Sequence, residues 1–203
     1  LLSAFASAAE FSARMFMQDQ TGEVTGRIFV KNGMIRNELD GWDQTIVYII
    51  DSNQKVAWQL LPGNMYMEIP VSEAPNTLVS EEYEEVNLGV ETVEGYVCDV
   101  IRFIYKDKSL GAVTHWIARK LGYPLRIEET DAAGKVKATA EFSRIKEEAL
   151  CGCLFEPPEG YERLALFDSM LGKGGGKDST GVPDSISIPG FPGDLSSIPG
   201  IPE

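Results

Sequence analysis

The chain has 203 residues, of which 43% are hydrophobic and 9% aromatic, and this is enough for one folded domain with an appendage. Its formal net charge is −13, from 31 acidic and 18 basic residues. An acidic balance of this size lacks the basic footprint that phosphate backbones and anionic lipid headgroups require. We therefore expect no nucleic-acid partner.

The first nine residues resemble the end of a secretory signal peptide. The stretch "LLSAFASAAE" has an apolar run followed by Ala6-Ser7-Ala8, an A-x-A cleavage signature. We expect residues 1–9 to be a signal-peptide remnant and the mature protein to be soluble and periplasmic or otherwise extracytoplasmic. The alternative is a fragment of an ordinary apolar helix. No later segment approaches the ~20 apolar residues of a membrane span, so we expect no integral membrane span.

The next part of the chain alternates apolar and polar residues, which is typical of β-strands. Six strands separated by short turns are predicted in succession, and they form a meander. Asn32-Gly33, flanked by apolar alternation, is the strongest hairpin signal among these turns. The predicted strands are residues 10–20, 23–30, 34–40, 44–50, 55–61 and 64–69.

The alternation stops between Pro70 and Leu88. The stretch "TLVSEEYEEVNL" has apolar residues at helical spacing, so we expect a short helix or an irregular lid there. Strands then resume at residues 89–96, 97–105, 111–119, 124–130 and 135–145. About ten or eleven strands with little helix between them favour a mainly β fold over a doubly wound α/β sheet. We expect one large, curved antiparallel sheet forming an unclosed β-barrel.

The end of the chain changes character twice. Leu164, Phe167, Met170 and Leu171 share one helical stripe that Gly172 ends, which predicts a C-terminal helix and a folded domain over residues 10–171. Residues 172–203 are rich in Gly and Pro, and we expect them to be a disordered tail. Ser-Ile-Pro-Gly occurs twice in this tail, either as plain low complexity or as a docking motif for an envelope protein partner.

The residues that commonly carry chemistry do not form a catalytic or metal-binding pattern. His115 is the only histidine, no G-x-S-x-G elbow is present, and the glycine run of the tail has no strand before it. We expect no enzymatic activity, no cofactor and no metal. In an oxidising compartment, Cys98 is expected to form a disulfide with Cys151 or Cys153, which leaves one thiol free.

The apolar residues of the first six strands are rich in methionine. Methionine is flexible and suits a surface that must fit varied apolar shapes, so a curved sheet lined with it would bind acyl chains. An ordinary packed core is the alternative. The residues predicted to form this apolar ligand-binding wall are Met15, Met17, Val30, Trp58, Met65, Met67 and Trp116.

The order of these features resembles the LolA-like superfamily. The stretches "TGRIFVKNGMIRNEL" and "LGVETVEGYVCDV" follow its pattern, and Phe155, Pro157, Pro158 and Gly160 match the F-x-P-P-x-G that ends its lipoprotein carriers. In this interpretation, Leu154 and Phe155 end the last strand and the two prolines stop the sheet.

The resemblance implies an incomplete β-barrel whose apolar interior accommodates acyl chains. It implies an exported envelope protein that acts as a lipid or lipoprotein carrier or sensor, with an acyl chain or a lipidated protein as its partner. One departure is that Val30-Lys31-Asn32-Gly33 lacks the arginine that latches the lid of LolA. The alternative function is a non-carrier envelope interaction module with a packed core, acting through its surface and its Ile-Pro-Gly tail.

Overall fold

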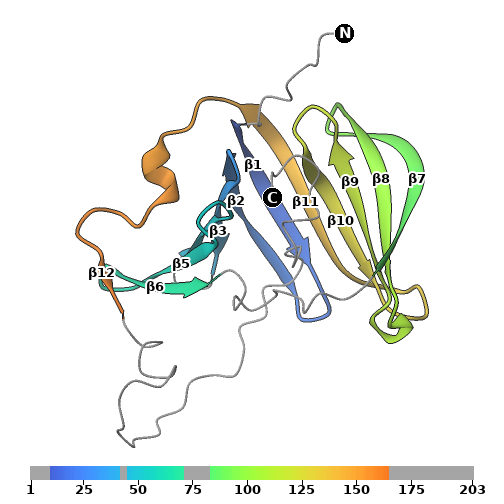
Figure 1. Ribbon diagram of the computed structural model, residues 1–203, viewed down its shortest axis with the longest axis horizontal. Helices are drawn as coiled ribbons and strands as arrows, with labels where there is room; N and C mark the ends of the chain where they lie inside the picture. Colours follow the sequence, from blue (N-terminus) through green and yellow to red (C-terminus); the bar gives the residue numbers. More distant parts are fainter. Residues whose placement is uncertain (1–9, 42–44, 71–82, 165–203) are drawn as a thin grey trace, which may run out of the picture.

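A computed structural model describes residues 10–41, 45–70 and 83–164 of the chain. These residues form one sheet of twelve strands (Figure 1). The first six strands are β1 (Glu10–Gln18), β2 (Glu23–Lys31), β3 (Met34–Asp40), β4 (Thr45–Asp51), β5 (Val56–Leu61) and β6 (Met65–Pro70). The others are β7 (Tyr83–Val93), β8 (Tyr96–Tyr105), β9 (Ala112–Ala118), β10 (Tyr123–Thr130), β11 (Val136–Glu147) and β12 (Glu162–Arg163).

The sheet is open, with β12 at one edge and β7 at the other, in the order β12-β6-β5-β4-β3-β2-β1-β11-β10-β9-β8-β7. Neighbouring strands run antiparallel except β12, which runs parallel to β6. The sheet is strongly curved, with β2–β6 on one side of the central strands β1 and β11 and β7–β10 on the other (Figure 1). The predicted mainly β fold with an unclosed, curved antiparallel sheet is confirmed.

The hairpin predicted at Asn32-Gly33 is present. Both residues have positive φ angles, 49° and 79°, and Lys31 pairs directly with Met34. This is the two-residue loop whose twist matches that of the flanking strands. Glu94-Gly95 forms a second such loop, with φ angles of 50° and 82°, and therefore β7 ends at Val93, before the strand boundary that the sequence predicted.

Where the structure describes the stretch predicted as a short helix or an irregular lid, residues 83–88, it has a strand instead. Residues from Tyr83 onward form β7, which pairs with β8 along its length, and residues 71–82 lie outside the described part. The ring of Tyr83 contacts that of Phe103 edge to face, with centroids 5.2 Å apart. Pairing with the neighbouring strand outweighs the weak helical spacing of the apolar residues.

The segment after β11 crosses the outside of the sheet to its far edge (Figure 1). It contains the 3₁₀ helix η3 (Gly152–Phe155) and then β12, where Glu162 N donates to Asn64 O of the β5–β6 turn at 2.8 Å. The prediction that Leu154 and Phe155 end the last strand is therefore wrong, because β11 ends at Glu147. After the two prolines, the chain adds a strand to the sheet beside β6.

The predicted C-terminal helix is not supported by the described residues. Glu162 and Arg163, just before the predicted helical stripe, are in β12, and residues 165–203, with the rest of the stripe and the Ile-Pro-Gly tail, lie outside the described part. The helices that the structure describes are η3 and η2 (Lys108–Leu110), both 3₁₀ turns. No described helix has the length and hydropathy needed to cross a bilayer.

A candidate apolar binding face

The two faces of the sheet are distinguished by strand parity. Phe11, Ala13, Met15 and Met17 alternate with more exposed residues along β1, and all four are buried. We call the face that carries them the concave face. The opposite, outer face of β2–β5 is the one that η3 covers, as Figure 1 shows.

The concave face is apolar over most of its width. Strand register carries it from β1 to Ile28 and Val30 on β2, to Ile35 on β3 and to Ile50 on β4. In the other direction, Met15 and Met17 pair with Phe142 and Ala140 of β11. The buried side chains of this cluster come from β1–β4, from β8–β11 and from the β9–β10 turn. No charged residue lies on the concave face among the described residues of β1–β6.

Most of the predicted wall residues lie on this face or in its cluster. Met15, Met17 and Val30 are buried there, at 4%, 3% and 8% exposure. Met65 and Met67 pair with Leu61 and Gln59, which places them on the concave side of β6, where they are half-buried. Whether these side chains contact a ligand stays a prediction.

Trp116 belongs to the same buried cluster, with a polar edge. The guanidinium carbon of Arg126 lies 4.7 Å from the centre of the Trp116 ring, and the indole Nε1 donates to Glu91 Oε2 at 2.8 Å. The tryptophan thus joins the apolar cluster to the charged groups of β7 and β10.

Trp58 does not lie on the concave face. It pairs with Ile49 of β4 and Glu68 of β6, and this row is on the outer face. There it packs against the cluster of Ile49, Leu150 and Phe155, and its Nε1 donates to Glu68 Oε2 at 3.3 Å. The prediction that Trp58 is part of the wall is therefore wrong. Because the C-terminal segment packs on the outer face of β5, this strand has apolar residues on both faces, and its sequence does not show which face is concave.

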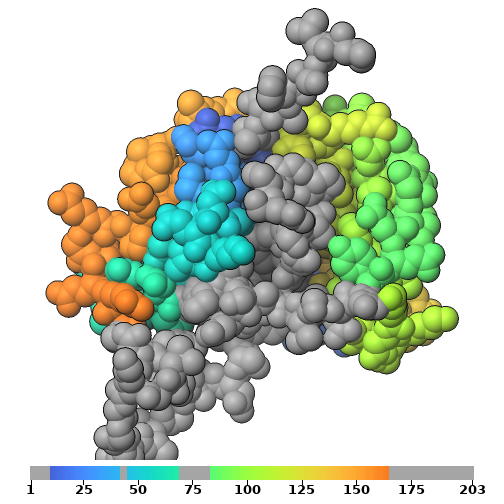
Figure 2. Space-filling view, viewed as in Figure 1, coloured from blue at the N-terminus to red at the C-terminus, as the bar shows by residue number. Residues whose placement is uncertain are grey.

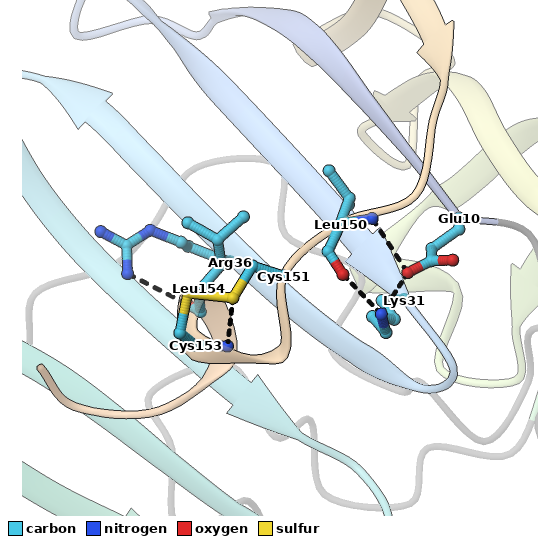
Figure 3. The surroundings of a disulfide bond; sticks show 7 residues. All are labelled: Glu10, Lys31, Arg36, Leu150, Cys151, Cys153 and Leu154. Carbon is cyan, nitrogen blue, oxygen red and sulfur yellow. Dashed lines mark hydrogen bonds and ion pairs between the residues drawn. A yellow bond between two sulfur atoms is a disulfide. The ribbon is translucent and has the colours of Figure 1, made fainter.

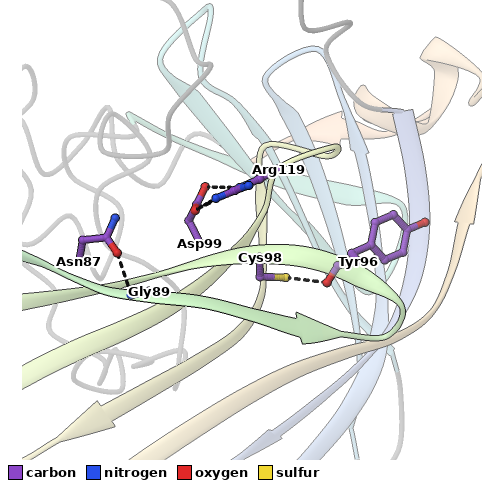
Figure 4. A network of polar contacts seen from close by, with 6 residues as sticks. All are labelled: Asn87, Gly89, Tyr96, Cys98, Asp99 and Arg119. Atoms are coloured by element: carbon purple, nitrogen blue, oxygen red, sulfur yellow. Dashed lines mark hydrogen bonds and ion pairs between the residues drawn. The ribbon is translucent and has the colours of Figure 1, made fainter.

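The cysteine pairing also differs from the prediction. The disulfide joins Cys151 and Cys153 within the exposed turn that begins η3 (Figure 3). Cys98 is a free thiol, fully buried in β8, whose Sγ donates to Tyr96 O at 3.4 Å (Figure 4). The strand pairs of β8 with β7 and β9 hold Cys98 inside the sheet, while the chain carries the other two cysteines to the outer face.

The outer segment is fastened by polar contacts as well as by Phe155. The ammonium of Lys31 donates to Leu150 O and pairs with Glu10, whose Oε1 accepts from Leu150 N at 3.0 Å (Figure 3). Arg36 Nη1 donates to Leu154 O at 3.0 Å. Since these contacts are all on the outer face, the described part of the segment packs on the side of the sheet away from the concave face.

Burial shifts the pKa of several groups in and around the cluster. It raises the pKa of Tyr48 and of Tyr123, so both phenols are protonated at neutral pH. It lowers the pKa of His115 to about 4, and the imidazole is neutral. Among the described residues, no group of three or more His, Cys, Asp or Glu side chains could hold a metal ion.

The polar side chains on the concave face were not predicted from the sequence. Asn37, Tyr48 and Gln59 occupy neighbouring positions on β3, β4 and β5. The signal that could have revealed Asn37 is its position on the concave side of β3, where the period-two alternation otherwise places apolar residues. Using this signal requires the parity of β3 to be known.

Comparison with known proteins supplies a family. Residues 11–122, more than half of the chain, match the family model described as a domain of unknown function, DUF4412. The chain belongs to the DUF4412 family. The match covers β1–β9 and stops before β10 and the outer segment. No curated protein matches this DUF4412 chain.

Several solved structures share its fold. An uncharacterised conserved protein of Thermus thermophilus is similar at a TM-score of 0.58 and 16% identity, over 78% of this chain and 91% of that one. MucB in the Pseudomonas aeruginosa MucA/MucB complex is similar at a TM-score of 0.54 and 18% identity, over 74% of this chain. A separate MucB structure is similar at a TM-score of 0.53 and 17% identity, over 77% of this chain.

These similarities show the fold alone. The DUF4412 chain spans 56% and 60% of the two MucB chains, so it corresponds to part of that protein. The LolA-like fold implied by the sequence pattern is confirmed at this level.

Proposed function

We propose that this protein binds an apolar ligand, an acyl chain above all, against the concave face of its sheet. The observation that carries the proposal is the continuous apolar surface that β1–β4 and β11 present on one face, without a charged residue among the described residues of β1–β6. Flexible methionines at Met15 and Met17 lie at its centre and suit a variable apolar shape. The function proposed is binding, as a lipid or lipoprotein carrier or sensor, and not catalysis.

The proposal includes an extracytoplasmic location. The Cys151–Cys153 disulfide supports it, because disulfides persist in oxidising compartments. The "ASA" signature before Ala9 supports it as well. A lipid carrier of the bacterial envelope needs this location, since its ligand lies between membranes.

Native mass spectrometry tests ligand binding directly. The full chain, purified from a lysate that contains membranes, is expected to carry a co-purified lipid and, once delipidated, to take up a fluorescent fatty acid. Absence of both would overturn the proposal. Oxidation state is read in the same spectra, because the disulfide lowers the mass by two hydrogens.

A second candidate function is an interaction module, and the edge strand β7 favours it. Among the described residues, β7 pairs only with β8 and forms one rim of the molecule (Figure 2). Leu88 and Val90 are 54% exposed on it. At the bulge between Asn87 and Gly89, Asn87 Oδ1 accepts from Gly89 N (Figure 4). An open strand edge with exposed apolar side chains is suited to pairing with an extended peptide.

The charge of β7 defines the peptide. Its sequence contains Glu84, Glu85 and Glu91 and no basic residue, so it would repel a second copy of itself and attract a basic strand. We propose an extended partner that alternates apolar residues with lysine or arginine. The similar MucB chain is solved as a MucA/MucB complex, which makes partner binding the natural rival to ligand carriage.

Peptide binding distinguishes this candidate. Fluorescence anisotropy is expected to show binding of a labelled alternating Val-Lys peptide and no binding of a Val-Glu peptide. Val90→Arg should abolish the binding, whereas Val136→Arg, at an exposed apolar residue of β11, should preserve it. Equal binding by both variants would contradict docking on β7. Truncation after Gly172 tests the separate proposal that a partner binds the Ile-Pro-Gly tail.

A further inference from the structure

The concave face contains one row of polar side chains. Strand register places Asn37 of β3 directly beside Tyr48 of β4, and Tyr48 directly beside Gln59 of β5. Ile35 of β3 and Ile50 of β4 border the row on one side. Along the same register, the row continues with the apolar residues Ile28 of β2 and Ala13 of β1. Three hydrogen-bonding side chains are thus grouped in an otherwise apolar surface.

Asn37 is the most constrained member of this row. Its side chain is only 3% exposed, and its Oδ1 is a buried acceptor with no hydrogen-bond partner in the described structure. A buried amide oxygen without a partner costs free energy that a packed core would avoid with an apolar residue. Its position on the proposed binding face indicates that its partner is part of a ligand.

The row is uncharged, as is the rest of the concave face on the described residues of β1–β6. The phenol of Tyr48 is protonated, because burial raises its pKa. An ionised carboxylate or phosphate placed here would be desolvated without a cation to pair with. A neutral group that donates a hydrogen bond would satisfy Asn37 Oδ1 at no such cost.

We infer that Asn37, Tyr48 and Gln59 form a recognition site for an uncharged hydrogen-bond donor, a hydroxyl, on an acyl ligand. The ligand class is therefore a neutral hydroxyl-bearing acyl lipid such as a monoacylglycerol, in preference to a free fatty acid. Asn37 Oδ1 accepts from the hydroxyl, while the Tyr48 hydroxyl and the Gln59 amide donate to neighbouring oxygens of the ligand. This inference rests on the proposed function, because it assigns the polar end of the same ligand.

Ligands that share one acyl chain but differ in their polar group show how much the polar group contributes to binding. Displacement of a fluorescent acyl probe from the full chain gives dissociation constants for 1-monooleoylglycerol, methyl oleate and oleate. We expect monooleoylglycerol to bind about tenfold more tightly than methyl oleate, which has no donor, as one net hydrogen bond allows. Oleate should bind less tightly than monooleoylglycerol at pH 8.

Two variants assign the preference to the row. Asn37→Leu should remove the preference for monooleoylglycerol and leave the affinity for methyl oleate unchanged or higher. Tyr48→Phe removes one hydroxyl, preserves the ring, and should reduce the preference, so it serves if Asn37→Leu does not fold. Gln18→Leu, at an exposed residue on the outer face of β1, is the matched control and should behave as the unsubstituted protein.

The outcomes distinguish the recognition site from the binding function on which it rests. Equal affinities for monooleoylglycerol and methyl oleate, or a preference that persists in both variants, would overturn the recognition site while the binding function stands. Failure of all three ligands to displace the probe, with no probe uptake, would overturn the proposed function itself.

Discussion

His115, the only histidine, is a structural residue of the sheet. It is 5% exposed, pairs with Ile101 and Ile127 on the neighbouring strands, and contacts the ring of Phe103 at 5.1 Å. Burial holds its pKa at about 4 in the folded protein, against about 6.5 in the unfolded chain. The unfolded state therefore binds more protons below pH 6.5, and stability falls as the pH falls toward 4.

The free energy of unfolding should decrease by about 2 kcal/mol between pH 7.5 and pH 5 because of this residue. Urea denaturation at the two pH values measures the change. His115→Gln, which does not titrate in this range, should lose most of the pH dependence. An unchanged dependence in that variant would show that the imidazole is not buried as a neutral group.

The reactivity and pairing of the three cysteines can be tested directly. Cys98 is buried and its pKa is raised, mainly by burial, so the thiol is unreactive in the folded protein. Alkylation without reductant should label Cys98 only after unfolding, and peptide mapping should recover a disulfide between Cys151 and Cys153. A peptide that links Cys98 to either of the others would contradict the structure.

At the scale of elements, the outer segment is the most distinctive part of the fold. Phe155 is 1% exposed against Ile49 and Leu150, and the polar contacts of Lys31 and Arg36 flank it. The segment therefore packs as part of the domain on the side away from the concave face, although the sequence suggested only the end of a strand.

Removing the Phe155 ring should destabilise the protein strongly. Phe155→Ala is expected to lower the free energy of unfolding by about 3–5 kcal/mol, because it leaves a cavity in a closed cluster. Chemical denaturation measures the loss, and Glu156→Ala, at an exposed neighbour, should stay within about 0.5 kcal/mol of the unsubstituted protein. A similar small effect for both variants would mean that the segment is not docked.

The elements differ in how well the sequence predicts them. Strands and the Asn32-Gly33 hairpin were predictable, because period-two alternation and a turn that needs two positive φ angles are local properties. The first half of β7, residues 83–88, was not predictable, since these residues adopt a strand only by pairing with β8. The parity of Trp58 was not predictable either, because a distant segment supplies the second apolar face.

At the scale of the whole molecule, the curved open sheet followed from the count and order of strands. Sequence also placed Met15, Met17 and Val30 together, since large apolar residues alternate on central strands. The polar row could not be predicted, because it exists only through the register of β3, β4 and β5. The local sequence of each strand shows one polar residue, and only the sheet brings the three together.

Neighbouring residues of β11 offer the most direct test of whether the concave face holds a ligand. Ala140 is 1% exposed on the concave face between Met17 and Ile127, while Thr139 lies on the outer face beside Gln18 and Glu128. Ala140→Phe adds a ring to the face on which the acyl chain is proposed to bind, and Thr139→Phe adds the same ring on the other side. Circular dichroism checks that both variants fold. If Ala140→Phe does not fold, Ala13→Leu is used in its place.

The measurement is titration of the delipidated proteins with a fluorescent acyl probe. We expect saturable binding to the unsubstituted protein and to Thr139→Phe, and a loss of affinity of about tenfold or more for Ala140→Phe. Equal affinity in all three proteins, or loss in Thr139→Phe alone, would contradict a ligand site on the concave face.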